Sequence, residues 1–95
     1  PVLIVTANKK GYGNALADSA CALENMMIAA NALDLGSCWI NRAKQEFESE
    51  EGKEILRALG IEGDWEGIGH CIIGYPDGPE PKAPRRKPNR YYFVE

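Results

Sequence analysis

The chain of 95 residues is long enough for one small domain, or for part of one, because a single hydrophobic core needs on the order of 100 residues. Its 44% hydrophobic and 26% charged residues are ordinary for a folded protein and exclude a largely disordered chain. The net charge of −3 argues against nonspecific nucleic-acid binding by the whole domain, and no apolar run reaches the ~20 residues of a membrane span.

The amino-terminal segment Val2–Thr6 is a run of β-branched and apolar residues. Such a run is typical of a strand that is covered on both faces, so we expect a central strand here. A polar loop follows, in which Gly11-Tyr12-Gly13 lacks the third glycine and the Lys-Ser/Thr ending of a phosphate-binding loop. We therefore interpret it as a surface connection, after which either Asn14 or Asp18 begins a helix.

A long helix from Asp18 to Leu35 is the main feature of the sequence. Its few polar residues fall on a narrow stripe, and a helix this apolar around its circumference is predicted to be buried. Gly36 is predicted to end the helix in a left-handed conformation. Residues 37–40 then favour a short extended segment, in which the indole of Trp39 suits core packing as well as ligand contact.

The segment Asn41–Leu59 fits one or two short amphipathic helices, the second ended by Gly60. Its carboxylates, from Glu46 to Glu54, are interpreted as a solvated helical face rather than as a catalytic pair or a metal cluster.

The segment Gly67–Tyr75 alternates glycines with apolar residues, as an inner strand does when something packs closely over it. It contains His70, the only histidine. A lone histidine in an apolar strand is more often a hydrogen-bonded structural residue than a catalyst, and we predict the structural role.

Residues 76–95 are predicted to form a proline-rich basic tail. Five prolines or glycines between Asp77 and Pro88 oppose a helix, and Lys82–Arg90 carries five basic residues and no acid. Tyr91–Val94 form either a final strand or an arm that docks on a partner. A basic run with aromatic residues also occurs in single-strand binding proteins, but five charges in such a tail seldom suffice, so we expect no nucleic-acid partner.

The three cysteines, Cys21, Cys38 and Cys71, have no CxxC spacing and no flanking histidine pattern. Neither a zinc site nor a disulfide framework is therefore indicated. We expect buried thiols and a location in the reducing cytoplasm.

Three blocks of this sequence together resemble the FMN-dependent nitroreductase family. They are Asp18–Ala30 with its Glu24-Asn25-Met26-Met27 core, Leu35–Ile40, and Gly67–Pro76 followed by Pro84-Arg85-Arg86-Lys87-Pro88. Their order and spacing match the carboxy-terminal half of that family, and the resemblance extends from Pro1 to about Pro88.

The resemblance implies an α+β fold, an α/β/α sandwich with a mostly antiparallel sheet, in which the long buried helix lies in the core of a homodimer. It implies an NAD(P)H oxidoreductase that uses FMN and reduces nitroaromatics, quinones or similar acceptors by ping-pong hydride transfer. Protein side chains then orient the flavin and need not act as acid or base. The implied cofactor-binding residues are Cys38, Trp39, Ile40 and Asn41 beside the flavin ring, and Arg85, Arg86 and Lys87 at the phosphate.

The sequence also departs from the family pattern. Members are roughly twice as long and carry an amino-terminal Arg-Ser-x-Arg motif that this chain lacks, and Asp34 stands where a glycine is common. We therefore expect residues 1–95 to be a partial domain of a longer protein that holds FMN weakly or not at all by itself. The alternative is a non-catalytic dimerisation or structural module derived from the same fold.

Overall fold

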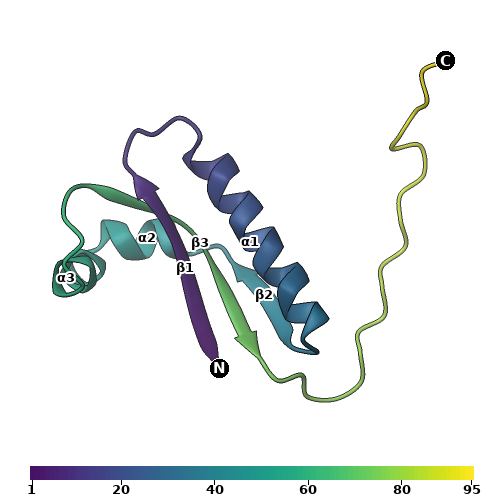
Figure 1. The fold of residues 1–95 in the computed structure, drawn as a ribbon, viewed down its shortest axis with the longest axis horizontal. Helices are drawn as coiled ribbons and strands as arrows, with labels where there is room; N and C mark the ends of the chain where they lie inside the picture. The colour runs from purple at the N-terminus through teal and green to yellow at the C-terminus, as the bar shows by residue number, and fades with distance from the viewer.

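The structure is a computed structural model that describes residues 1–95. It contains an antiparallel sheet of three strands in the order β1-β3-β2, formed by β1 (Val2–Lys9), β2 (Gly36–Ile40) and β3 (Trp65–Gly74). The strand that is last in sequence, β3, lies in the centre (Figure 1).

The prediction that Val2–Thr6 forms a central strand is wrong for this chain, because β1 is an edge strand. Its side chains are largely accessible, with Val2 59% and Leu3 51% exposed. The central place goes to β3, which pairs with β1 along one edge and with β2 along the other. Apolar composition predicted the strand correctly but does not fix its position in the sheet.

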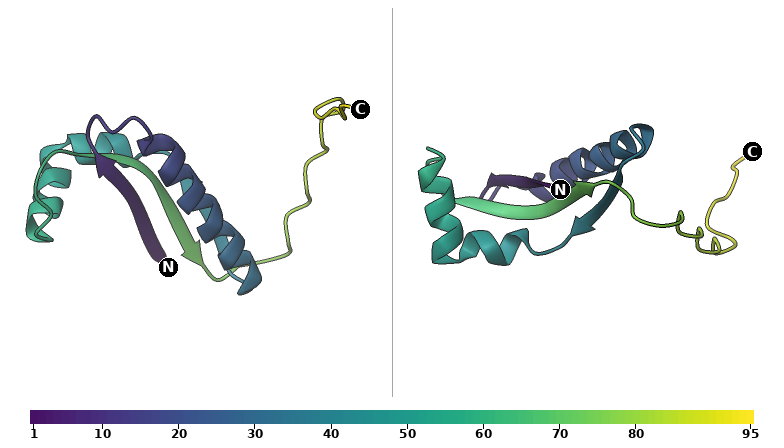
Figure 2. Two further views of the ribbon diagram at one scale, coloured as in Figure 1. Left: turned by 45° about the horizontal axis from the view of Figure 1, so that its top comes forward. Right: turned by 90° about the horizontal axis from the view of Figure 1, so that it is seen from below.

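Helix α1 (Ala15–Ala32) packs along one face of the sheet (Figures 1 and 2). It begins after Asn14, one of the two predicted starts, and buries a single face, made by Ala15, Ser19, Leu23 and Ala30. The amide of Asn8 on β1 donates to the Ser19 hydroxyl at 3.0 Å, which ties the start of the helix to the sheet.

The prediction that this helix is buried around its circumference does not hold for the single chain. Leu16 and Ile28 on α1 and Leu33 at its carboxyl end are 66%, 59% and 70% exposed. The sequence pattern reported correctly that the helix is apolar on several sides, but the sheet covers only one of them.

The prediction that Gly36 ends α1 in a left-handed conformation is wrong, because the left-handed residue after the helix is Asp34. Asp34 has φ 57°, its amide donates to the Asn31 carbonyl at 3.1 Å, and the Leu35 amide donates to the Ala30 carbonyl at 2.9 Å. This pair of hydrogen bonds is the Schellman motif, with Asp34 at the position that glycine usually takes. Gly36 is thereby free to begin β2.

The prediction of one or two short helices after the second strand is confirmed, because the structure has two, α2 (Ala43–Glu48) and α3 (Glu50–Ala58). Helix α2 lies on the opposite side of the sheet from α1, and α3 stands next to α2 beyond the end of the sheet, as the view from below in Figure 2 shows. Gly60 (φ 75°) ends α3 in the predicted way, because its amide and that of Ile61 donate to the carbonyls of Arg57 and Leu56. Helices therefore cover both faces of an antiparallel sheet, as expected for the α+β fold.

The glycines of β3 let the helical layers approach the strand closely, as the sequence predicted. A Cβ on Gly67 would collide with the Ala43 carbonyl of α2, whereas a Cβ on Gly69 would lie 2.8 Å from Leu23 Cδ1 of α1. The two glycines face opposite sides because Ile68 has no partner on β1, where the register shifts between Thr6 and Ala7. This bulge lets both layers pack closely against the same end of β3.

No helix or strand follows Gly74, and the rest of the chain runs away from the body as a tail (Figure 1). The absence of a helix between Asp77 and Pro88 agrees with the prediction. Tyr91–Val94 do not form a strand in the single chain, and their side chains are at least 79% exposed. None of the helices has the length and hydrophobicity needed to cross a membrane.

Candidate functional site

The predicted ring-contact residues lie on β2 and on the turn that follows it. Strand β2 is an edge strand that pairs only with β3, so its outer backbone edge is not used by the sheet. The prediction of a short extended segment here is confirmed. Cys38 and Ile40 stand beside Ile72 and His70 of β3, and Asn41 begins the turn into α2.

Trp39 points to the α1 side of the sheet. A Cβ placed on Gly69 would lie 2.9 Å from the Trp39 Nε1 atom, so the indole packs directly over this glycine, next to Leu23. Of the two roles that the sequence left open for the indole, core packing describes its place in the single chain. Cys38 and Ile40 alternate with Trp39 along the strand and therefore point to the other face.

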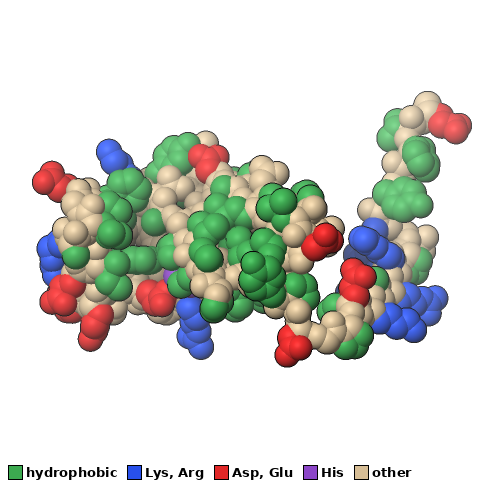
Figure 3. Space-filling model, turned by 60° about the horizontal axis from the view of Figure 1, so that its bottom comes forward, with side chains coloured by type: hydrophobic (Ala, Val, Ile, Leu, Met, Phe, Trp, Pro, Cys, Tyr) green, Lys and Arg blue, Asp and Glu red, His purple; other side chains and the backbone are tan.

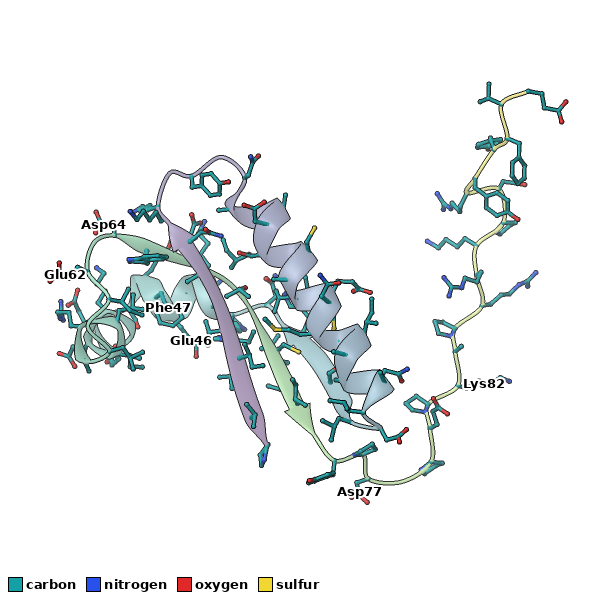
Figure 4. The ribbon with its side chains drawn as sticks, viewed as in Figure 1. Glu46, Phe47, Glu62, Asp64, Asp77 and Lys82 are labelled. Atoms are coloured by element: carbon teal, nitrogen blue, oxygen red, sulfur yellow. The ribbon has the colours of Figure 1, made fainter.

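His70 follows Gly69 on β3 and points to the α2 side. It is 3% exposed, and its Nε2 atom pairs with the carboxylate of Glu46, which Figure 4 labels on α2. The predicted role of His70 as a hydrogen-bonded structural residue is confirmed. The interpretation of Glu46 as part of a solvated face is incomplete, because its side chain is 53% exposed but also holds this buried ring.

No sequence signal pointed to Glu46. It sits among several acidic residues of the same segment, and only its place three residues after Ala43, which lies over Gly67, turns it toward the strand. A packing argument from the glycine-rich strand to the facing helix would have been needed to find it.

Hollows in the surface border this region on two sides. A cavity of about 290 Å³ lies where β2 and β3 meet, lined in part by Cys38, Ile72 and Gly74. A second, of about 540 Å³, lies between α3 and the start of β3, with Phe47, Glu62 and Asp64, which Figure 4 labels, in its wall. The first adjoins the predicted ring-contact strand.

The predicted phosphate residues are not near β2 in the single chain. Arg85, Arg86 and Lys87 are exposed on the tail, and Figure 3 shows basic side chains gathered there, apart from the body. The tail does leave the sheet beside the start of β2, because Gly36 pairs with Gly74 and a Cβ on Gly36 would lie 4.0 Å from Pro76. The assignment of both groups to one site stays a prediction.

The cysteines do not all follow their prediction. Cys71 is buried, whereas Cys21 and Cys38 are exposed in the single chain, and all three are free thiols. The prediction of buried thiols is therefore wrong for two of them. It relied on their apolar neighbours in sequence, and those neighbours lie on faces that the three-stranded sheet leaves open.

Comparison with known proteins gives one consistent result. The Nitroreductase family matches residues 1–75. The chain is similar to a crystal structure of a nitroreductase with bound FMN from Bacteroides fragilis, at 32% sequence identity and a TM-score of 0.86. That likeness covers 100% of this chain and 51% of the other, so the chain spans about half the length of its structural relative, and no match was found among the curated proteins. The match over most of the chain, together with the shared fold, shows that the chain belongs to the nitroreductase family.

Proposed function

We propose that the chain is part of an oxidoreductase that binds FMN and takes electrons from NAD(P)H. The single observation that carries this proposal is the likeness of the whole chain to half of a nitroreductase that was solved with FMN bound. The acceptors proposed are nitroaromatics, quinones or similar compounds, as the family resemblance implies.

The residues of β2 suit a planar cofactor. The unpaired edge of β2 offers backbone amides and carbonyls for directed hydrogen bonds, and Ile40 is a half-buried apolar side chain next to them. Asn41 adds an amide where the strand turns toward α2. A flavin ring requires this kind of surface, with apolar walls and a few directed donors.

The basic tail suits the phosphate of FMN, because Arg85 and Arg86 can each bind a phosphate through two N–H groups and Lys87 adds a charge. About nine residues separate Pro76 from Arg85, and an extended chain of this length spans up to about 30 Å. Strand β2 is only about 17 Å long. The tail is therefore long enough to reach any point along β2, of its own subunit or of a partner.

FMN when bound supplies the hydride chemistry, and the chain supplies binding and orientation. Ile40 and Asn41 would fix the plane of the ring against the strand edge, and the cations of the tail would neutralise the phosphate. Trp39 packs over Gly69 on the α1 side of the sheet, the side opposite to Ile40, and would hold β2 in place from there. No side chain in this arrangement needs to exchange a proton with the substrate.

We also propose a homodimer and a reducing, cytoplasmic location. Leu16 and Ile28 on α1 and Leu33 just after it are large apolar side chains exposed on several sides of the helix, and they support an interface around it. Three unpaired thiols are typical of a reducing compartment. Sedimentation equilibrium over a range of concentrations tests the dimer.

A flavin titration tests the proposed function. FMN fluorescence should be quenched saturably when the 95-residue chain is added, and riboflavin, which lacks the phosphate, should bind more weakly. Absence of saturable quenching up to millimolar protein would contradict flavin binding by this chain.

The alternative is a non-catalytic dimerisation module of the same fold, which is favoured by the fact that the chain spans only half of its structural relative. This alternative predicts a concentration-dependent dimer with no flavin quenching. The two measurements together therefore separate the two functions.

A further inference from the structure

A buried contact on the α2 side of the sheet has no role in the function proposed so far. His70 is 3% exposed in the middle of β3, and its Nε2 atom pairs with the Glu46 carboxylate. Its other ring nitrogen, Nδ1, is buried and has no hydrogen-bond partner. A buried polar side chain with only one partner depends strongly on that partner.

The contact with Glu46 determines which ring nitrogen of His70 donates a hydrogen bond. A carboxylate only accepts hydrogen bonds, so Nε2 carries the proton and donates it to Glu46. Nδ1 has no hydrogen-bond partner of either kind. Glu46 is therefore the one group that satisfies this ring, and the ring is the group that draws a half-exposed carboxylate onto the sheet.

Helix α2 needs such an anchor because it has only six residues. A helix this short has little stability of its own and depends on contacts with its surroundings. Three kinds of contact hold it on β3. Its Ala43 turn and Phe47 pack over Gly67, Lys44 forms an ion pair with Glu66 near the start of the strand at 3.8 Å, and Glu46 accepts the hydrogen bond of His70. The last is the only polar contact between α2 and the middle of the strand.

The anchor acts on the predicted flavin contacts through a very short connection. Ile40 pairs with His70 itself, and only Asn41 and Arg42 separate the end of β2 from the start of α2. The backbone of this turn is thus held at one end by the strand pairing and at the other by α2. If α2 moves away from the strand, the turn loses one of its two supports.

We propose that His70 and Glu46 are positioning residues that fix the Ile40–Arg42 turn, and with it the flavin-contact backbone, by holding α2 on the sheet. The proposal rests on the proposed function for its flavin part. Its structural part, the dependence of the turn on the Glu46–His70 contact, stands independently of that function.

Amide hydrogen exchange on the 95-residue chain without flavin tests the structural part. Glu46→Ala removes the acceptor at a half-exposed position, where the fold tolerates truncation. The amides of residues 41–48 should then exchange about tenfold faster, since a hydrogen bond to a charged group contributes at least this factor. Glu46→Gln and His70→Gln each keep one hydrogen-bonding partner in place and should restore most of the protection.

Ser19→Ala is the matched control, because it removes the hydrogen bond from Asn8 at the far end of the other helical layer. It should lower global stability without a selective effect on residues 41–48. Equal exchange of these residues in Glu46→Ala and the wild type, or an equal acceleration in Ser19→Ala, would overturn the proposal.

Flavin titration of the same variants tests the functional part. Glu46→Ala should weaken FMN binding several-fold, Glu46→Gln should restore it, and Ser19→Ala should leave it unchanged. Faster exchange with unchanged FMN affinity overturns the positioning role while the proposed function stands. A wild type that binds no FMN refutes the proposed function for this chain, and the exchange measurement alone then decides whether the anchor exists.

Discussion

Asp34 ends α1 in a backbone conformation that its own side chain disfavours. It holds φ 57° at the left-handed position of the Schellman motif, where a residue with a Cβ is strained relative to glycine. Its carboxylate also sits at the negative end of the helix dipole, and the last turn of α1 contains no basic residue to offset it. Asp34→Gly removes both defects, and Asp34→Asn removes mainly the second.

The expected gain follows from three contributions. Relief of the left-handed conformation contributes about 1 kcal/mol, and removal of a negative charge from the helix carboxyl end contributes about 0.5 kcal/mol. The greater freedom of glycine in the unfolded chain opposes these by about 0.6 kcal/mol. We therefore expect Asp34→Gly to stabilise the fold by about 1 kcal/mol, and Asp34→Asn by about half as much.

Urea unfolding followed by circular dichroism measures the change in the free energy of unfolding for both variants. In thermal unfolding, 1 kcal/mol corresponds to a rise in Tm of about 4–8 °C for a domain of this size. Glu95→Gln is the matched control, because it removes a carboxylate from the far end of the tail, away from every helix (Figure 1), and should change little. The reasoning is refuted if Asp34→Gly is less stable than the wild type. Equal gains from Asp34→Asn and Glu95→Gln would show that the dipole plays no part.

The remaining predictions concern close packing and the tail. Gly67→Ala should destabilise the fold by about 3 kcal/mol, at the upper end for overpacking, because its Cβ meets the backbone carbonyl of Ala43, and urea unfolding would reveal this. Gly69→Ala should cost about 1–2 kcal/mol, because its neighbours are side chains, and it should shift the emission of Trp39 when measured in a Trp65→Phe background. Loss of both arginines in Arg85→Ala/Arg86→Ala should weaken FMN binding at least about tenfold while riboflavin binding is unchanged. The variant Lys82→Ala/Arg90→Ala removes the same charge from the same tail, and an equal loss of FMN affinity there would reduce the effect to nonspecific attraction.

Local sequence patterns predicted the elements of this fold more securely than their positions. The alternation of glycine with apolar residues correctly indicated an inner strand at β3, because only a strand with close neighbours on its faces tolerates so many missing side chains. The run Val2–Thr6 was as clearly a strand, but its place at the edge depends on which strands pair with it. Composition contains no information about pairing.

The end of α1 shows how a strong rule selects the wrong residue. Glycine is the usual left-handed residue after a helix, and Gly36 was the nearest glycine. The left-handed residue is instead Asp34, two positions before Gly36, because Leu35 and Gly36 are needed to lead the chain into β2 in register with Gly74. Tertiary pairing thus imposed the left-handed conformation on Asp34, at a small cost in local stability.

The predicted cofactor-binding residues stay a prediction once the fold is known. Residues adjacent in sequence, Cys38 to Asn41, are necessarily near one another, and the structure adds that they lie on an open strand edge. Whether Arg85, Arg86 and Lys87 join them depends on the path of the tail in the assembled protein. Resemblance to a family can assign the tail and β2 to one cofactor site. The contacts within this chain cannot, because no residue of the tail packs on the sheet.

The bulge at Ile68 explains how one strand can control the candidate site from both sides. Without the extra residue, Gly67 and Gly69 would face the same layer, and close packing would be possible on only one face at that end of β3. With it, Gly67 faces α2 on the same side as His70, so the packing of Ala43 and the Glu46 contact support α2 together, while Gly69 seats the indole of Trp39 from the α1 side. Strand β2 and the turn after it are therefore fixed from opposite faces by two consecutive residues of β3. A flavin on the outer edge of β2 would bind to a backbone whose geometry is set by residues that it never touches.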